Sequence, residues 1–204
     1  PEFLSPDEVC RLLDEIDAYH KNSASRSGRD PNDLWLKGLI RLAVFTGLRR
    51  GELLALKWGD VDLENDLLLI RNRRDGSFKT KSGKERRVPL AGDALSVLEQ
   101  KKESERNSPQ GLIFTDDGAE IRPDRVSKRF KFYVREAGLP GRERISFHSL
   151  RHTCASWLAM KGTPMRVIQG ILGHSSINVT ERYSHLRPKV RSKAMQEAFG
   201  GIEI

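Results

Sequence analysis

Basic side chains occur in this chain beside glycines, at positions where a helix is predicted to begin. The sequence T-G-L-R-R-G-E at residues 46–52 places Arg49 just after a glycine break between two predicted helices. Arg49 would then project from the start of the second helix, where backbone N–H groups also favour an anion. Its planar guanidinium matches a phosphate through two hydrogen bonds, which a lysine ammonium cannot do. Taken alone, this segment is explained more simply by a surface ion pair with Glu52.

A second segment, H-S-L-R-H at residues 148–152, carries a histidine and an arginine three positions apart. If both are helical, His148 and Arg151 share one face of the helix and could address the same phosphate. His148 and His152 also have the spacing of a zinc-binding helix, but Ser149 stands where that motif requires glutamate. We therefore expect no metal site here, and we expect His152 to be a structural residue.

Tyr183 could act as a nucleophile. It lies nine residues after His174, which belongs to an L-G-H-S segment, and directly after Arg182. A free phenol has a pKa of about 10, so it needs neighbouring arginines and histidines to stabilise the phenolate or to accept the proton. Without such help, a tyrosine among basic residues is ordinarily a core-edge residue whose hydroxyl contacts water.

Lys81 lies at the tip of a predicted hairpin that is rich in basic residues. A basic hairpin tip is usually a solvated face or a non-specific contact to the DNA backbone. By itself, this segment therefore indicates nothing about catalysis. The neighbouring basic residues are Lys79, Lys84, Arg86 and Arg87.

The elements that must position these side chains are mostly helical. Apolar periodicity and helix end signals predict helices over residues 5 to about 20, 32–47, 50–56, 91–105, 122–137, 149–160, 164–172, 177–185 and through 194–199. Short strands are predicted at 67–70, 76–80 and 86–90, the last two joined by a turn at 81–84. The predicted fold class is therefore mainly α with a small antiparallel three-stranded β-sheet.

Composition narrows the classes of function. The 204 residues include 36 Lys+Arg and 28 Asp+Glu, which gives a formal net charge of +8 and favours a polyanionic partner. No segment approaches the roughly 18 apolar residues of a membrane span, and no secretory segment is evident. We expect a cytoplasmic protein without a membrane partner. Cys10 and Cys154 match no metal or redox spacing, and we expect both to be free, buried thiols.

The motifs gain meaning from their joint occurrence. In order, the chain reads T-G-L-R-R-G-E, K-S-G-K-E-R-R-V-P-L, H-S-L-R-H-T, L-G-H-S and E-R-Y. This succession, from Leu4 to about Arg187, resembles the tyrosine recombinases, also called the phage integrase family. The resemblance implies the DNA breaking-rejoining catalytic fold of that family. It also implies site-specific DNA recombination through a 3′-phosphotyrosyl intermediate, without metal, ATP or another cofactor.

The resemblance assigns a role to each matching residue. Tyr183 would attack a scissile DNA phosphate, and His148 would assist removal of its proton. Arg49 and Arg151 would neutralise the non-bridging phosphate oxygens as charge develops. His174 would donate a hydrogen bond to the same phosphate.

Lys81 would protonate the leaving 5′ oxygen, with Lys79 and Lys84 as competing assignments for this role. Glu52 would support the active site without touching the substrate. Other basic residues would line a DNA-facing surface and set affinity instead of sequence choice. The residues expected to contact DNA are Arg50, Arg73, Arg74, Lys79, Lys84, Arg86, Arg125, Lys128 and Arg129.

Residues 1–3 fit no predicted element, and we expect them to be a remnant of an expression vector. The resemblance implies that residues 4–186 form the catalytic domain and that residues 187–204 form a tail helix, which packs on its own domain or on a neighbouring protomer. We expect a fragment that lacks the family's N-terminal DNA-clamping domain. The implied partners are double-stranded DNA, further copies of the full-length protein in a tetramer on DNA, and accessory DNA-bending proteins. The implied location is the nucleoid of a bacterial cell.

Two alternatives use the same residues differently. A DNA-binding module that has lost its chemistry would bind DNA without cleaving it, but all six catalytic positions are occupied by the expected residue types. A type IB topoisomerase would share the chemistry and relax supercoils instead of exchanging strands. The residues of the L-G-H-S and T-G-L-R segments favour an integrase over a type IB topoisomerase.

Overall fold

The computed structural model describes residues 2–23, 33–81, 83–104, 108–141 and 143–186. The predicted tail helix at 194–199, and its docking in either position, lie outside these residues. So do most of the loop predicted at 21–31 and the first residue of the predicted remnant at 1–3.

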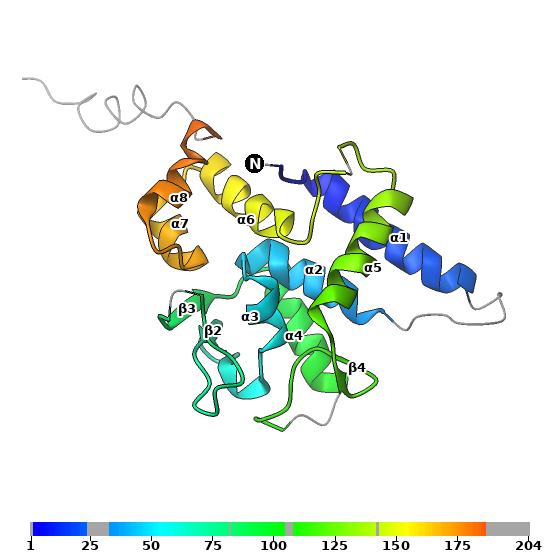
Figure 1. Cartoon of the computed structure of the whole chain (residues 1–204), viewed down its shortest axis with the longest axis horizontal. Helices are drawn as coiled ribbons and strands as arrows, with labels where there is room; N and C mark the ends of the chain where they lie inside the picture. The colour runs from blue at the N-terminus through cyan, green and yellow to red at the C-terminus, as the bar shows by residue number, and fades with distance from the viewer. Residues whose placement is uncertain (1, 24–32, 82, 105–107, 142, 187–204) are drawn as a thin grey trace, which may run out of the picture.

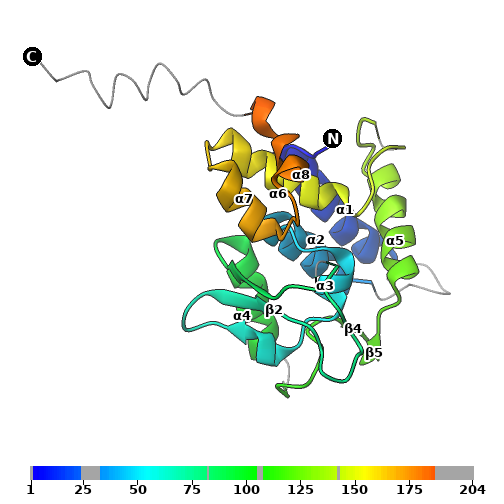
Figure 2. The same cartoon turned by 60° about the vertical axis from the view of Figure 1, so that its left-hand side comes forward.

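Helices dominate the described ranges, and the predicted mainly α class with a small antiparallel sheet is confirmed. Figure 1 and Figure 2 show α2 running through the middle, with α1 and α5 on one side and α6, α7 and α8 on another. The described α-helices are α1 (Pro6–Ser23), α2 (Trp35–Thr46), α3 (Arg50–Leu54), α4 (Asp93–Ser104), α5 (Pro123–Glu136), α6 (Ser149–Met160), α7 (Met165–Leu172) and α8 (Ile177–Glu181).

The three-stranded sheet differs from the predicted one in its membership. It consists of β1 (Val61–Asp62), β2 (Leu67–Ile70) and β3 (Arg86–Pro89), in that order and all antiparallel. The predicted strand at 76–80 is wrong, and β1 takes its place as the third strand. A further two-stranded hairpin, β4 (Thr115–Asp116) with β5 (Ala119–Glu120), was not predicted.

The connection from β2 to β3 spans residues 71–85, and its described residues, 71–81 and 83–85, form no ladder of their own. Ile70 lies directly opposite Arg86, so the hairpin pairing is complete before the connection begins. Within the connection, the Thr80 amide donates to the Asn72 side chain at 2.9 Å, and the Thr80 hydroxyl donates to the Lys84 carbonyl at 3.0 Å. Local side-chain bonds of this kind satisfy the backbone without a strand.

Two apolar cores hold the molecule together. The larger one contains side chains from all the helices from α1 through α5, from the three-stranded sheet and from the start of α6. The smaller one lies where α6, α7 and α8 meet, a grouping that is visible in Figure 1. Apolar residues spaced three and four apart turn one face of α7 into this smaller core. Its buried members are Cys154, Ala155, Ala159, Met165, Ile168, Leu172 and Tyr183.

Two local predictions were wrong. The helix predicted over 177–185 ends at Glu181 and is followed by a 3-10 turn, Ser184–Leu186, because the Tyr183 amide bonds the Thr180 carbonyl three residues back. Cys10 is exposed, since Val9, Leu12 and Ile16 form the buried face of α1 and position 10 lies beside it. Cys154 is buried, and both thiols are free as predicted.

A buried carboxylate joins α1, α2 and α5 outside the motif regions. Asp33 is fully buried just before α2 and accepts hydrogen bonds from three side chains. The Tyr133 hydroxyl lies at 3.0 Å, His20 Nε2 lies at 2.8 Å, and the Arg129 guanidinium forms an ion pair with it. A buried ion is stable only when it is paired in this way.

Replacing Asp33 with alanine should therefore destabilise the fold strongly. The change leaves Arg129 without its carboxylate, which in comparable buried pairs costs about 3–5 kcal/mol. Urea denaturation measures the effect. The matched control is Asp124→Ala, because Asp124 forms exposed ion pairs on the same helix as Arg129 and its loss should change little. Equal losses in the two variants would contradict a special role for Asp33.

Candidate active site

The corner between α2 and α3 depends on a glycine. Gly47 ends α2 with φ +64°, a left-handed conformation that glycine adopts without strain. A Cβ at this position would lie 2.3 Å from Leu172 Cδ2, so a larger residue would displace α7. The Gly47 carbonyl accepts a hydrogen bond from Arg151 Nη1 at 2.7 Å. The T-G-L-R spacing therefore places Arg49 at the start of α3 and ties that corner to α6.

Glu52 supports two arginines from the interior. Its side chain is buried and accepts from the Arg49 amide at 2.9 Å and from Arg49 Nη1 at 3.0 Å. Arg86 donates to both carboxylate oxygens, at 3.0 and 2.8 Å. Burial alone would raise the pKa of Glu52, but Arg86 and then Arg49 outweigh it, and the pKa is lowered. The predicted supporting position of Glu52 agrees with this geometry.

The C-terminal end of α7 collects three arginines. A helix leaves its last carbonyls without partners inside the helix, and its negative end attracts cations. Here three consecutive carbonyls each accept from a different guanidinium. Arg86 Nε binds the Ile171 carbonyl at 3.0 Å, Arg151 Nη2 binds that of Leu172 at 2.7 Å, and Arg49 Nη2 lies 3.4 Å from that of Gly173. Satisfying this helix end therefore also fixes the two arginines that the motifs singled out.

Arg151 is a buried cation with uncharged hydrogen-bond partners. Its side chain is 2% exposed, and the contacts described above are to backbone carbonyls. Burial and the neighbouring charge of Arg49 lower the pKa of Arg151 to about 10. Glu52 offsets part of this effect, but two other arginines already share its carboxylate. The position is therefore short of negative charge, as expected for a site that binds an anion.

Three predicted catalytic residues line one cavity of about 410 Å³. Arg49 comes from the start of α3, Lys81 from the β2–β3 connection and His148 from the residue before α6. Burial, and then the charges of Arg151, Arg49 and Lys81, lower the pKa of His148. The remaining lining residues are Leu48, Arg50, Gly51, Ser127, Ser146 and Phe147.

His174 lies directly after the glycine that ends α7. Its Nδ1 is 2.9 Å from the hydroxyl of Thr180, a buried residue of α8. Burial is the main cause that lowers the pKa of His174 to about 3, and Arg151 and Arg49 add to the effect. His174 is therefore neutral at physiological pH in the DNA-free chain.

Tyr183 belongs to the smaller core. Its side chain is 1% exposed, and its hydroxyl lies 2.5 Å from Nδ1 of His152 on α6. Burial raises the pKa of Tyr183, although Arg182 and Arg151 act in the opposite direction. One hydrogen-bond partner of this hydroxyl is thus His152, a residue that the sequence assigned only to structure, and the Arg182 side chain is another. No local pattern links two positions that are 31 residues apart.

Three predicted DNA contacts have internal partners instead. Arg86 binds Glu52, as described above, and Arg129 binds Asp33. Arg73 donates to Asp60, a buried residue, and to the Ala55 carbonyl at 2.6 Å. The side chains of these three arginines are at most 18% exposed. These partners give the three arginines a role in internal packing, and their contact with DNA stays a prediction.

The other predicted DNA contacts are more accessible. Arg50 lines the 410 Å³ cavity and donates to the Ser127 hydroxyl. Arg125 pairs with Asp116 and lies over the ring of Trp35. The exposed members are Arg74, Lys79, Lys84 and Lys128.

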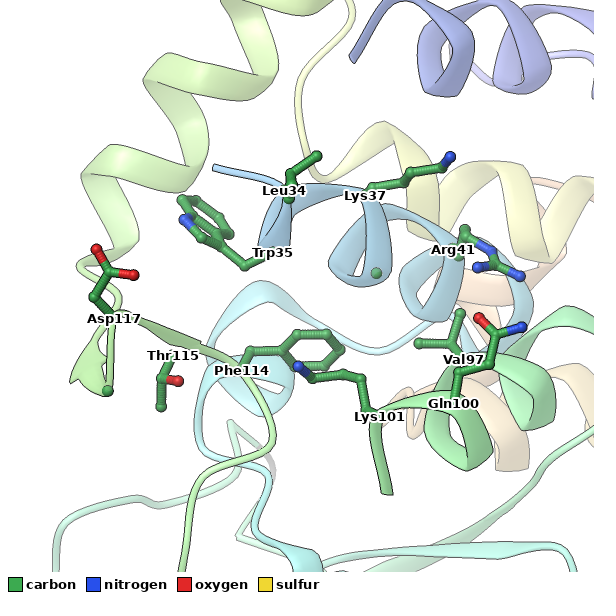
Figure 3. A pocket seen from close by; sticks show the side chains of 12 residues that line it. Leu34, Trp35, Lys37, Arg41, Val97, Gln100, Lys101, Phe114, Thr115 and Asp117 are labelled. Atoms are coloured by element: carbon green, nitrogen blue, oxygen red, sulfur yellow. The ribbon is translucent and has the colours of Figure 1, made fainter. Parts of the chain in front are cut away.

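A larger cavity, of about 740 Å³, lies between the start of α2, α4 and β4 (Figure 3). Two of its cationic side chains already have acidic partners. Lys37 Nζ is 2.5 Å from Asp17, and Arg41 Nε is 2.6 Å from Asp93. None of the six predicted catalytic residues lines this cavity, so it is not the site that the motifs indicate.

The sequence matches the model of the phage integrase family over residues 2–189. The chain belongs to the phage integrase family. This membership confirms the family that the motif order indicated. Within the described ranges of this family member, no helix is both long enough and apolar enough to cross a bilayer.

Curated relatives are tyrosine recombinases. The chain is 32% identical over 192 residues to a XerC-like tyrosine recombinase of Caldanaerobacter subterraneus subsp. tengcongensis, covering 79% of this chain and 48% of the relative. It is 31% identical over 187 residues to the tyrosine recombinase XerH of Campylobacter jejuni subsp. jejuni, covering 91% and 48%. The chain therefore spans about half the length of the curated relatives it matches.

Solved structures share the fold. XerH bound to palindromic difH substrate, in a post-cleavage complex, matches with a TM-score of 0.67 and 28% identity, over 97% of this chain and 52% of that one. The catalytic domain of bacteriophage HP1 integrase matches with a TM-score of 0.62 and 25% identity, over 98% and 95%. The predicted recombinase catalytic fold is thus confirmed.

Arg86→Gln should destabilise the chain, whereas Arg87→Gln should change its stability little. Removing Arg86 leaves Glu52 with one arginine and the Ile171 carbonyl without its donor, a loss of about 3 kcal/mol for a buried pair of this kind. Arg87 is the exposed neighbour on the same strand. Urea denaturation of both variants checks this expectation. If Arg86→Gln kept wild-type stability and lost only DNA affinity, the original surface assignment would be right.

The free energy of unfolding should fall as the pH drops below about 6.5. His174 and His152 have folded-state pKa values of about 3 and about 4, against about 6.5 in an unfolded chain, so the unfolded chain takes up protons first. His174→Asn should flatten the decrease between pH 7 and pH 5.5, measured by urea denaturation. His185→Asn, at an exposed position, serves as the control. A slope unaffected by His174→Asn would refute the assignment.

Proposed function

We propose that residues 4–186 form the catalytic domain of a site-specific DNA recombinase that cleaves and rejoins double-stranded DNA through a 3′-phosphotyrosyl intermediate. The observation that carries this proposal is the arginine cluster at the end of α7, beside the buried nucleophile candidate Tyr183. Two of its arginines, Arg49 and Arg151, retain N–H donors beyond those used in the contacts described above. Arg49 lines the 410 Å³ cavity together with Lys81 and His148, and the charge of Arg151 also acts on His148.

In the proposed reaction, the Tyr183 oxygen attacks phosphorus, and the bond from phosphorus to the 5′ oxygen breaks. Lys81 donates a proton to the leaving oxygen, while the hydroxyl proton of Tyr183 passes to a neighbouring base, the role proposed for His148. Arg49 and Arg151 stabilise the charge that develops on the non-bridging oxygens, an effect worth about 3–4 kcal/mol per donor in comparable sites. Rejoining is the reverse step with a new 5′ hydroxyl and needs no ATP.

DNA affinity would come largely from the accessible basic side chains around the cavity. Because phosphate contacts release counterions, binding should weaken as the salt concentration rises. The proposed surface combines Arg50 at the cavity with the exposed residues Arg74, Lys79, Lys84 and Lys128.

The solved structure of XerH bound to its difH substrate supports DNA as the substrate that we propose. Exchange between two DNA sites, assembly of a tetramer and help from DNA-bending proteins are proposed for the full-length protein. Action at the bacterial nucleoid, in the cytoplasm, follows from the same substrate. A catalytic domain alone should cleave DNA weakly and should fail to complete strand exchange between two sites.

A nicked suicide duplex tests the chemistry, because loss of the short cleaved strand traps the covalent adduct. The duplex should carry the site that the chain itself selects from random DNA. We expect a protein–DNA adduct from the wild type and at least a 1000-fold lower yield from Tyr183→Phe, on the order of the loss seen when a nucleophile is removed. Tyr19→Phe, which removes a hydroxyl from α1, is the control and should react like the wild type. An adduct that survives Tyr183→Phe would overturn the assignment.

A further inference from the structure

The contact between His152 and Tyr183 has no place in the proposed reaction so far. His152 follows Arg151 on α6, and its Nδ1 lies 2.5 Å from the Tyr183 hydroxyl. The two rings are tilted at 45° with centroids 6.0 Å apart, so they meet edgewise through the polar atoms instead of stacking. Both side chains lie where α6 faces the 3-10 turn after α8.

The chemistry of the two groups fixes the direction of this hydrogen bond. Burial, and then the neighbouring His148, lower the pKa of His152 to about 4, so its ring is neutral at pH 7. Burial also raises the pKa of Tyr183, which keeps the phenol protonated. A phenol is a better O–H donor than a neutral imidazole is an N–H donor, and the bare imidazole nitrogen is the better acceptor. The hydroxyl therefore donates to Nδ1, and the ring proton of His152 is on Nε2.

The position of the imidazole is itself fixed on its other side. The ring of His148 meets the ring of His152 at 4.9 Å and 87°, an edge-to-face contact. On the same turn of α6, Arg151 is held by the Gly47 and Leu172 carbonyls. One helical turn thus fixes both a phosphate-binding cation and the partner of the tyrosine hydroxyl.

Packing alone does not fix the direction of that hydroxyl. The ring of Tyr183 is held among apolar residues of the smaller core, but a phenolic O–H can still rotate about its C–O bond. A bond to Nδ1 selects one orientation of the proton. The lone pairs of the same oxygen are then directed away from Nδ1, toward the side on which the Arg182 guanidinium donates to it.

We propose that His152 is a positioning residue for Tyr183: before the reaction its Nδ1 accepts the hydrogen bond of the hydroxyl and so sets the orientation of the oxygen that attacks the scissile phosphate. The proton itself leaves for His148 as the bond to phosphorus forms. This inference rests on the proposed function of Tyr183 as the nucleophile. It adds a residue that the family motifs did not assign. It also explains why a histidine, and not merely a space-filling side chain, follows Arg151.

Three substitutions at position 152 separate hydrogen bonding from packing. Asparagine places an amide oxygen where Nδ1 lies, glutamine extends its amide to the position of Nε2, and phenylalanine fills the space without an acceptor. With a saturating amount of the nicked suicide duplex, we expect His152→Asn to form adduct within about threefold of the wild-type rate. His152→Gln and His152→Phe should be slower by at least about tenfold, since a small misplacement of a reacting group costs up to about 100-fold.

DNA affinity and thermal stability serve as readouts of purely structural damage. Both should stay close to wild type in His152→Asn and His152→Gln, so that the difference in their rates reports the place of the acceptor. Equal adduct rates in the wild type, His152→Gln and His152→Phe would overturn the inference and leave the proposed function intact. Equal slowing of His152→Asn and His152→Phe would overturn it as well. If the wild type itself formed no adduct on its selected DNA, the proposed function would fail.

A measurement without DNA keeps the inference testable in that last case. Nitrogen-15 NMR of histidine-labelled chain at pH 7 should show His152 as the neutral tautomer with its proton on Nε2, assigned by the loss of its signals in His152→Gln. Tyr183→Phe should shift the Nδ1 resonance because it removes the donor. A proton on Nδ1, or a resonance unchanged by Tyr183→Phe, would rule out the hydroxyl as a donor to this nitrogen and overturn the inference.

Discussion

The end of α7 is the constraint on which the site depends. A helix that ends inside a protein leaves carbonyls that must find donors, and here Arg49, Arg86 and Arg151 provide them. Each guanidinium has five N–H groups, so binding a carbonyl does not exhaust it. The same groups that complete the backbone of α7 can therefore also hold an anion. Stability and the proposed phosphate recognition would thus depend on one set of side chains.

Glu52 makes this concentration of positive charge tolerable. It is buried beneath Arg49 and Arg86 and gives them a common negative partner, while Arg151 depends on carbonyl dipoles. Around them the histidines stay neutral because burial and the arginines lower their pKa values. The result is a site whose charges are fixed in place before any ligand binds, the condition under which electrostatic stabilisation of a transition state, such as that of the proposed reaction, is most effective.

Sequence patterns predicted what is local. The bounds of α6 agreed with its apolar spacing and glycine end, and the T-G-L-R corner followed from glycine chemistry. The predicted strand at 76–80 failed because a strand needs a partner, and both edges of β2 are already paired, one with β1 and the other with β3. Alternation along β3 could have revealed that Arg86 shares the inward face with the buried Val88, opposite to Arg87. Nothing local could have paired His152 with Tyr183, since only the packing of α6 against the turn after α8 brings them together.

The lowered pKa of Arg151 has a consequence for the chain as a whole. A cation whose pKa is lowered by burial is stabilised when an anion comes near it. This stabilisation is largest where water is excluded. The DNA-free fold is thus electrostatically incomplete, and a bound phosphodiester would complete it. By mass action, such a ligand also makes the folded state more resistant to unfolding. If the proposed function holds, the substrate acts as a missing part of the core, and the folded chain resists unfolding most strongly when it is bound to DNA.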